Sequence, residues 1–236
     1  MLKSFFYFLR DLRYQMLFQV LHQYANGHVL DIGGWDFCLT AIKRKIPFEH
    51  WTVLEYDESH LPQVESSRVT IRQGDGCNMD YPDEQFDTIV CIQVAEHVFT
   101  PIQLFEESVR VLKKGCYGIY MFPQTGNLHS APYHYQNFTR FWAIEMCKRS
   151  GVDLVELHSL GGTWSTMASR LLYTPFQMLR FKGFTYPSSK RNFLYYLLAP
   201  LAFIFIVIGF PVCLLLSLGD MEEEANNHLF VFRKRT

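Results

Sequence analysis

Short apolar runs recur along the first half of the chain, and stretches with helical spacing separate them. A strand buried on both faces is a continuous apolar run, whereas a helix that covers a sheet has apolar residues three or four positions apart. The runs predict strands at 28–32, 51–57, 69–72, 86–92 and 117–122. The helical spacing predicts helices at 38–45 and 101–112. Strands that alternate with helices indicate βαβ units, so we expect an α/β fold with a mainly parallel sheet.

Residues 1–24 have the pattern of an amphipathic helix, with apolar residues such as Phe5, Leu12 and Val20 on one face. Arg10 interrupts the apolar run, so a signal peptide is not expected. The helix could pack on the domain or lie at a membrane surface, and the pattern leaves both open.

Composition and charge narrow the class of protein. The chain has 236 residues, 49% of them hydrophobic, which is enough for one core and an appendage. Its formal net charge of −1 does not favour nucleic acid as a partner. The six cysteines show no CxxC spacing, so we expect reduced thiols and predict neither a disulfide framework nor a metal site.

The candidate chemistry starts where the first apolar run ends. Asp31 is followed by Gly33 and Gly34, a pattern typical of a turn where backbone comes close to a ligand. Glu55 and Asp57 end the next run, roughly 25 residues later, where a dinucleotide-type fold places a carboxylate for ribose hydroxyls.

A longer succession of motifs carries a family resemblance. It comprises 74–76 (GDG), 81–87 (YPDEQFD), 96–98 (EHV), Pro101, Glu107, 110–115 (RVLKKG) and Pro123. In this order the motifs resemble the class I S-adenosylmethionine-dependent methyltransferases of the small-molecule, type 11-like group, over residues 29–162. The resemblance implies a Rossmann-like, mainly parallel seven-stranded sheet with helices on both faces. It also implies a sixth strand at 153–157 and an antiparallel closing strand at 228–232.

The resemblance further implies S-adenosylmethionine as cofactor and a role for each matching residue. The methionine part would lie near Asp31, Gly33 and Gly34. The ribose would meet Glu55 or Asp57, and the adenine Asp75 and Gly76. Gln93 would face the sulfonium. In the same family pattern Glu96 and His97 are expected to anchor the following turn, and Asp83 and Asp87 to be turn and strand-entry residues.

One departure from the family pattern concerns the glycine turn, where Trp35 and Phe37 replace further glycines. A side chain there could occupy part of the cofactor site, so a non-catalytic scaffold is an alternative reading.

If the chain is active, alignment of the two reactants supplies much of the acceleration of methyl transfer. A base is needed only if the acceptor loses a proton. His129 and His134 are the candidate catalytic residues because imidazole titrates near neutral pH, whereas His97 is expected to be structural. Tyr133 and Tyr135 are expected to line the acceptor pocket.

An apolar stretch at 193–219 follows a predicted helix at 164–181 and a basic loop at 182–191. It is long enough to cross a hydrocarbon core of roughly 30 Å. A single crossing would leave the closing strand on the far side, so Pro200 and Pro211 are expected to permit a hairpin. A soluble lid is the alternative, but a lid helix should show a polar face.

The sequence therefore predicts four regions. They are an N-terminal helix (1–27), a methyltransferase domain (28–162), a membrane-seated helical insert (163–225) and a closing strand (226–236). We expect methyl transfer to a small, lipidic or lipid-linked acceptor by a cytoplasmic catalytic domain at a membrane. The alternatives are the scaffold and a soluble small-molecule methyltransferase with an apolar lid.

Overall fold

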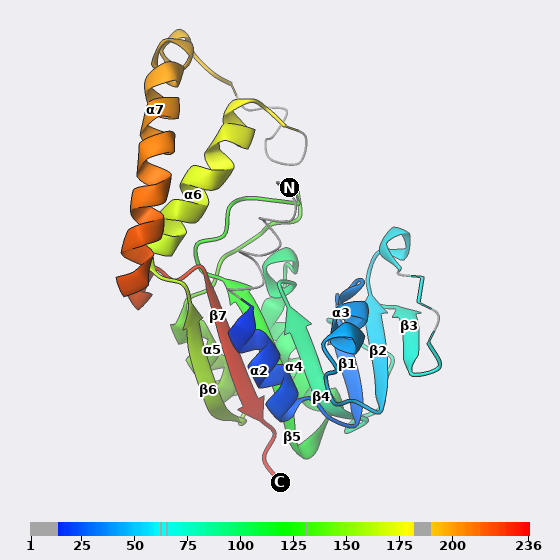
Figure 1. Cartoon of the computed structure of the whole chain (residues 1–236). Helices are drawn as coiled ribbons and strands as arrows, with labels where there is room; N and C mark the ends of the chain where they lie inside the picture. The colour runs from blue at the N-terminus through cyan, green and yellow to red at the C-terminus, as the bar shows by residue number, and fades with distance from the viewer. Residues whose placement is uncertain (1–13, 62, 65, 131, 182–189) are drawn as a thin grey trace.

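The computed structural model describes residues 14–61, 63–64, 66–130, 132–181 and 190–236. One seven-stranded sheet organises the chain, in the order β3-β2-β1-β4-β5-β7-β6 (Figure 1). Its strands are β1 (His28–Ile32), β2 (His50–Glu55), β3 (Val69–Gln73), β4 (Phe86–Ile92), β5 (Leu112–Pro123), β6 (Asp153–Leu160) and β7 (Asn227–Arg233). β1 to β5 pair in parallel, whereas β7 is antiparallel to both β5 and β6. The predicted fold class is confirmed, including the closing strand.

Helices cover both faces of the sheet. α2 (Gln15–Tyr24) and α3 (Phe37–Lys43) pack on one face, in a core that includes Val29, Trp51 and Val231. α4 (Pro101–Val111) and α5 (Arg140–Arg149) pack on the other, around Phe105 and Phe230. Neighbouring residues of one strand serve opposite cores because side chains alternate along a strand. The described part of the N-terminal helix therefore packs on the domain, and residues 1–13 of that prediction lie outside the described residues.

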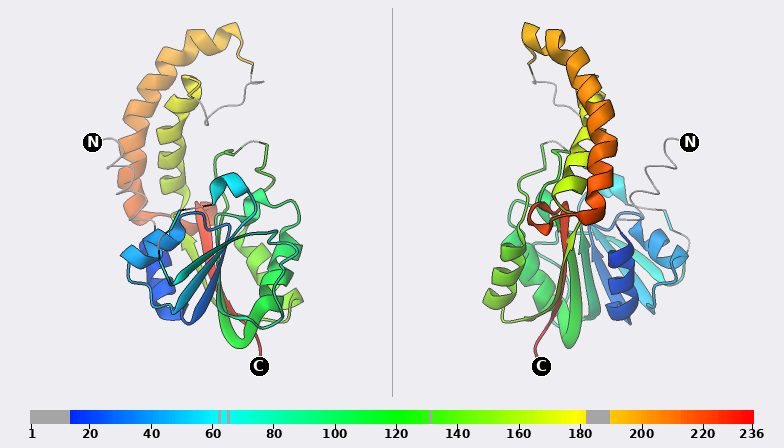
Figure 2. Two further views of the ribbon diagram at one scale, coloured as in Figure 1. Left: turned by 90° about the vertical axis from the view of Figure 1, so that its right-hand side faces the viewer. Right: turned by 60° about the vertical axis from the view of Figure 1, so that its left-hand side comes forward.

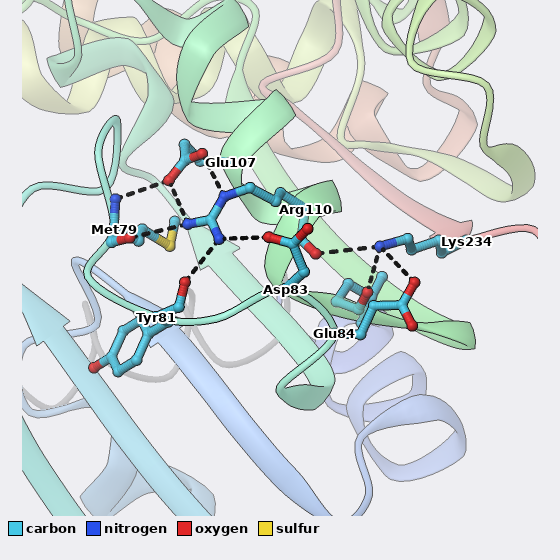
Figure 3. Close-up of polar contacts among 8 residues, drawn as sticks. Met79, Tyr81, Asp83, Glu84, Glu107, Arg110 and Lys234 are labelled. Carbon is cyan, nitrogen blue, oxygen red and sulfur yellow. Dashed lines mark hydrogen bonds and ion pairs between the residues drawn. The ribbon is translucent and has the colours of Figure 1, made fainter.

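The family motif around Arg110 joins α4 to the loop before β4 (Figure 3). The Arg110 guanidinium donates to both carboxylate oxygens of Glu107 at 2.7 and 2.8 Å, to Asp83 at 2.9 Å and to the carbonyl oxygens of Met79 and Tyr81. Asp87 binds the His28 amide at 2.9 Å and Lys113 at 2.6 Å. As expected, Asp83 and Asp87 are structural residues, and the motif is a framework for the sheet.

A helical hairpin rises from the edge of the sheet where β6 ends and β7 begins. α6 (Thr163–Met178) leads away from the sheet and α7 (Phe193–Leu216) returns to it (Figures 1 and 2). Since β6 is antiparallel to β7 and β7 to β5, this edge is also where the parallel strands have their carboxyl ends. In open α/β sheets that edge is the ligand-binding edge.

The hairpin corrects one prediction. Pro200 and Pro211 do not divide the apolar stretch, because α7 continues through both as a single helix. The chain reverses instead between α6 and α7, so that β7 returns to the sheet. Much of the predicted basic loop, residues 182–189, lies outside the described residues.

Polar contacts fasten the hairpin at both ends. At the base, Asp220 accepts hydrogen bonds from the amides of Trp164 (2.7 Å) and Ser165 (3.0 Å), which start α6. Near the apex, Arg191 donates to the carbonyl oxygens of Gln177 and Met178, which end α6. These contacts satisfy backbone groups that a helix leaves unpaired at its two ends.

The outer surface of α7 is apolar and exposed. Within the described residues, Phe193–Gly219 is the one stretch long and apolar enough to cross a membrane. An 18-residue window in it has a mean hydropathy of 2.8 and is 11% buried. Only Ile206 and Cys213 are buried in α7. Among the described residues, most of the apolar surface of α7 therefore has no partner.

Candidate active site

The turn after β1 closes over a buried carboxyl group. Asp31 is 1% exposed; its Oδ2 accepts a hydrogen bond from Trp51 Nε1 at 3.0 Å, and its Oδ1 has no partner. A Cβ on Gly34 would lie 1.9 Å from Asp31 Oδ2, and Gly33 has φ of +61°, so both positions require glycine. Burial raises the pKa of Asp31 to about 8. The Asp31 carboxyl group thus packs directly against the backbone of the glycine turn.

The two aromatic residues of this turn take different positions. Trp35 has φ of +51°, the left-handed conformation that glycine would supply, and its side chain is 54% exposed. Phe37 begins α3 and packs near Trp51, with ring centroids 6.3 Å apart. The backbone path expected of a glycine loop is therefore kept, at the cost of strain at Trp35.

Acidic residues gather beyond β2 and β3. Glu55 ends β2 and accepts a hydrogen bond from the Tyr56 amide at 3.0 Å. Asp57 instead caps the next turn, since it accepts from the amide and hydroxyl of Ser59 at 2.9 and 2.7 Å. A cavity of about 430 Å³ is lined by Tyr56, Gln73, Gly74 and Asp75.

Gly76 directly follows Asp75, which lines this cavity, and is needed for packing. A Cβ at this position would lie 2.7 Å from Leu104 Cδ1.

A second cavity, of about 440 Å³, opens beyond β4 and β5. Gln93 follows β4 with φ of +57° and donates to Asn227 Oδ1 at 3.0 Å. The cavity is lined by residues from the ends of β4 and β5, the loop after β5, α6 and β7. They include Gln93, Thr125, Asn127, His129, Arg170, Tyr173 and Asn227. Its wall is rich in hydroxyl and amide groups, and Arg170 is the one charged side chain among the described residues that line it.

Three histidines lie together, and one of them, His129, lines this cavity. The ring centroid of His129 lies 4.7 Å from that of His97 and 4.5 Å from that of His134. His97 Nδ1 lies 2.8 Å from the Tyr133 carbonyl oxygen, and His129 Nδ1 lies 2.8 Å from that of Asn127. In His134, Nε2 contacts Asn137 Oδ1 at 3.1 Å and Nδ1 accepts from the His129 amide. Burial lowers the pKa of His97 and of His134.

Glu96 does not cap the turn that it was expected to anchor. Its side chain is fully buried, and neither carboxylate oxygen has a hydrogen-bond partner. Burial raises its pKa to about 8. The anchoring comes from its backbone, because the Glu96 carbonyl accepts the Tyr135 amide at 2.9 Å.

The structure thus divides the predicted residues into two groups. Glu55 and Asp75 lie beyond β2 and β3, and Gln93 and His129 line the second cavity. His134 contacts the His129 ring but does not line the cavity. Tyr133 and Tyr135 are exposed and do not line the cavity, contrary to expectation. The analysis of the sequence missed Arg170, Tyr173 and Asn127. No local pattern marks them, because α6 and the loop meet only in the fold.

The chain resembles known proteins in sequence over the region that forms this site. The model of a methyltransferase domain family matches residues 31–120, from the carboxyl under the glycine turn to β5. A probable S-adenosylmethionine-dependent methyltransferase of Mycolicibacterium smegmatis is 28% identical over 158 residues, which is 64% of this chain and 57% of that protein. Residues 31–120 thus match a methyltransferase domain family, and the chain is similar in sequence to a protein named as an S-adenosylmethionine-dependent methyltransferase. The family predicted from the motifs is confirmed, and the cofactor of this family is S-adenosylmethionine.

Two further proteins resemble this chain, one in sequence and one in fold. The chloroplastic 2-methyl-6-phytyl-1,4-hydroquinone methyltransferase 2 of Oryza sativa subsp. japonica is 26% identical over 149 residues, 58% of this chain and 42% of that protein. Phosphoethanolamine N-methyltransferase 2 of Haemonchus contortus, solved with S-adenosyl-L-methionine, has a TM-score of 0.59 at 16% identity, over 96% of this chain and 53% of the other. That likeness shows the fold alone. The chain spans about half the length of the two curated relatives that it matches.

The residues present fit the cofactor. A glycine turn that no side chain can replace lies at the carboxyl end of β1. Glu55 ends β2 and is followed by Tyr56, which lines an open cavity. An anionic residue in that position can accept hydrogen bonds from ribose hydroxyls.

Proposed function

We propose that this chain transfers a methyl group from S-adenosylmethionine to a small acceptor held in the 440 Å³ cavity. The observation that carries the proposal is that Gln93 and His129 line a polar cavity at the same sheet edge as the glycine turn and Glu55. The cofactor, when bound, supplies an electrophilic methyl group. The chain's own task is to hold the acceptor in line with it and to exclude water.

The cofactor contacts can be assigned more narrowly than from the motifs. Glu55 is the proposed ribose ligand, because Asp57 already caps the turn at Ser59. Asp75 would meet the adenine, and the backbone of Gly33 and Gly34 the methionine part, with Asp31 and Gly76 shaping the turns. Gln93 would lie nearest the reacting atoms, and its amide is held by Asn227.

His129 is the better candidate for a base. Its Nδ1 donates to a carbonyl oxygen, so its Nε2 carries the lone pair that can take a proton from an acceptor hydroxyl. Both nitrogens of His134 are already engaged. His134 would then position His129, because its Nδ1 accepts a hydrogen bond from the backbone amide of His129.

The acceptor is proposed to be lipidic and the protein to be seated on a membrane, with the catalytic domain in the cytoplasm. The cavity wall and the apolar surface belong to one hairpin, since α6 supplies Arg170 and Tyr173 and packs along α7. A cavity joined to a lipid-facing helix suits an acceptor with a polar head and an apolar chain. The rice relative is named for such an acceptor, a hydroquinone with a phytyl substituent. A soluble lid fits less well because α7 has no polar face.

The test of the cofactor site is isothermal titration of the detergent-purified chain with S-adenosylmethionine. Glu55→Ala is expected to weaken binding at least about tenfold, since a hydrogen bond to a charged group contributes roughly 1.5–3 kcal/mol. Asp57→Asn is the matched control and should bind as the parent does. If the folded parent protein does not bind, the methyltransferase proposal fails and the scaffold reading takes its place.

The acceptor class needs a second experiment. With methyl-labelled cofactor, we expect label in an isoprenoid hydroquinone presented in vesicles, and much less in the same head group without its chain. Equal labelling of the two would exclude the lipidic acceptor and leave a small soluble one.

A further inference from the structure

We infer that Glu96, His97 and His129 form a binding site for a divalent zinc-like cation beside the 440 Å³ cavity, which His129 lines. One nitrogen or oxygen atom from each of the three side chains lies within 4.8 Å of the other two. His97 Nε2 and Glu96 Oε1 are 3.9 Å apart. Zinc lies about 2.0–2.2 Å from such ligands, so closure of the cluster around it needs a contraction of about 1 Å.

The two imidazoles are already oriented as metal ligands are. His97 and His129 each donate Nδ1–H to a backbone carbonyl oxygen at 2.8 Å, those of Tyr133 and Asn127. Such a bond fixes the tautomer and leaves Nε2 as the atom with a lone pair, which is the usual arrangement behind a zinc-bound histidine. His134 is excluded as a ligand because both of its nitrogens are hydrogen-bonded.

Glu96 provides an independent reason to place a cation here. A buried carboxyl group in a folded protein is normally paired or hydrogen-bonded. Glu96 is fully buried, both of its oxygens lack a partner, and among the described residues His97 alone lies within ion-pairing distance. A divalent cation between Glu96 and the two imidazoles would satisfy those oxygens.

The donor set indicates the kind of ion. Two imidazoles and one carboxylate are typical of zinc sites that keep a fourth position open, and they do not suit magnesium, which prefers oxygen ligands. Because His129 also lines the cavity, the open position can face the acceptor.

The role of the cation rests on the proposed function. The cation would lower the pKa of an acceptor hydroxyl bound to it. His129 would then act as a ligand of the cation and not as the base. The acceptor oxygen would release its proton to solvent and form the new bond to the methyl carbon. The carbon–sulfur bond would break, and its electron pair would remain on the neutral thioether.

The experiment is titration of the full chain, stripped with a chelator, with Co²⁺, whose visible absorption reports its coordination. We expect saturation at one equivalent, displacement by Zn²⁺ and no displacement by Mg²⁺. Glu96→Gln and His129→Asn should each weaken Co²⁺ binding at least about tenfold. His22→Asn, on the exposed side of α2, is the control for adventitious binding by a surface histidine and should leave it unchanged.

Titration with S-adenosylmethionine accompanies each variant. A chain that binds the cofactor but shows no saturable Co²⁺ absorption, or whose Glu96→Gln variant binds Co²⁺ unchanged, would overturn the metal site alone. A parent chain that binds Co²⁺ at one equivalent but not the cofactor would uphold the metal site and refute the proposed function.

Discussion

The sheet domain and the α6–α7 hairpin use apolar residues in opposite ways. In the domain, Phe105, Phe122 and Phe230 are fully buried, and the Phe230 ring packs against the other two. In α7, Phe205 and Leu201 lie in the open, and the helix contacts the chain mainly through α6. Apolar surface in the first region therefore stabilises the fold, whereas in the second it is available for an external partner.

The largest expected effect separates the two regions by membrane binding. Leu201 and Ile208 lie seven positions apart on one exposed face of α7. Because a lysine at the centre of a membrane helix costs roughly 2.5–3.5 kcal/mol, Leu201→Lys with Ile208→Lys should reduce sedimentation with vesicles at least about 100-fold. Ile102→Lys with Val155→Lys, at exposed positions of the sheet domain, is the control. Equal losses in the two double variants would contradict the assignment of membrane contact to α7.

The next effect separates the regions by folding stability. Phe230→Ala should lower the free energy of unfolding by about 3–5 kcal/mol, because it leaves a cavity among fully buried rings. Phe205→Ala should change it by less than about 0.5 kcal/mol, since that ring is exposed. Denaturant unfolding in detergent measures both. A large loss for Phe205→Ala would show that the hairpin belongs to the cooperative core.

A smaller effect concerns acid sensitivity where β7 meets the cavity. Burial, with a contribution from Arg140, lowers the pKa of His228 from 6.5 to about 4. Between about pH 6.5 and 4, His228 is protonated in the unfolded chain but not in the folded chain. It therefore lowers the stability of the fold as the pH falls through this interval. We expect the parent to lose on the order of 2 kcal/mol more than His228→Asn over that interval. Parallel acid unfolding curves for the two proteins would refute this.

The smallest effect tests the fastening of the hairpin. Asp220→Ala removes the side chain that accepts the first amides of α6, and an N-cap of this kind contributes about 1 kcal/mol. Hydrogen exchange at Trp164 and Ser165 should rise, while exchange in β4 stays unchanged. Glu222→Ala, a nearby exposed carboxylate, is the control and should have neither effect.

The sequence was informative where structure is local. Strands and helices of the domain follow from hydrophobic spacing, and Asp83 is a turn residue as its motif suggested. The contacts of Arg110 with Asp83 and Glu107 were not predicted. The sequence misled at Pro200 and Pro211, because a proline removes one backbone donor but α7 continues through both positions. It also gave no sign that α6 is the partner of α7.

The candidate site shows the same limit. Gln93 and Glu55 could be predicted because each directly follows or ends a strand. The neighbourhood of His97 and His129 could not, since two loops separated by β5 bring them together. The exposed state of Trp35, and the commitment of Asp57 to Ser59, depend on turns whose conformation no spacing encodes.

The hairpin connects two strands that are already neighbours. Leu160 and Asn227 are paired residues at the adjoining ends of β6 and β7, so the whole insert is, in topological terms, one long loop. Lengthening a loop costs little closure entropy. Insertion or excision of coding sequence at this single point would therefore leave every strand pair intact. Related chains can gain or lose this apolar hairpin in one evolutionary step, while the order and pairing of the strands are inherited unchanged.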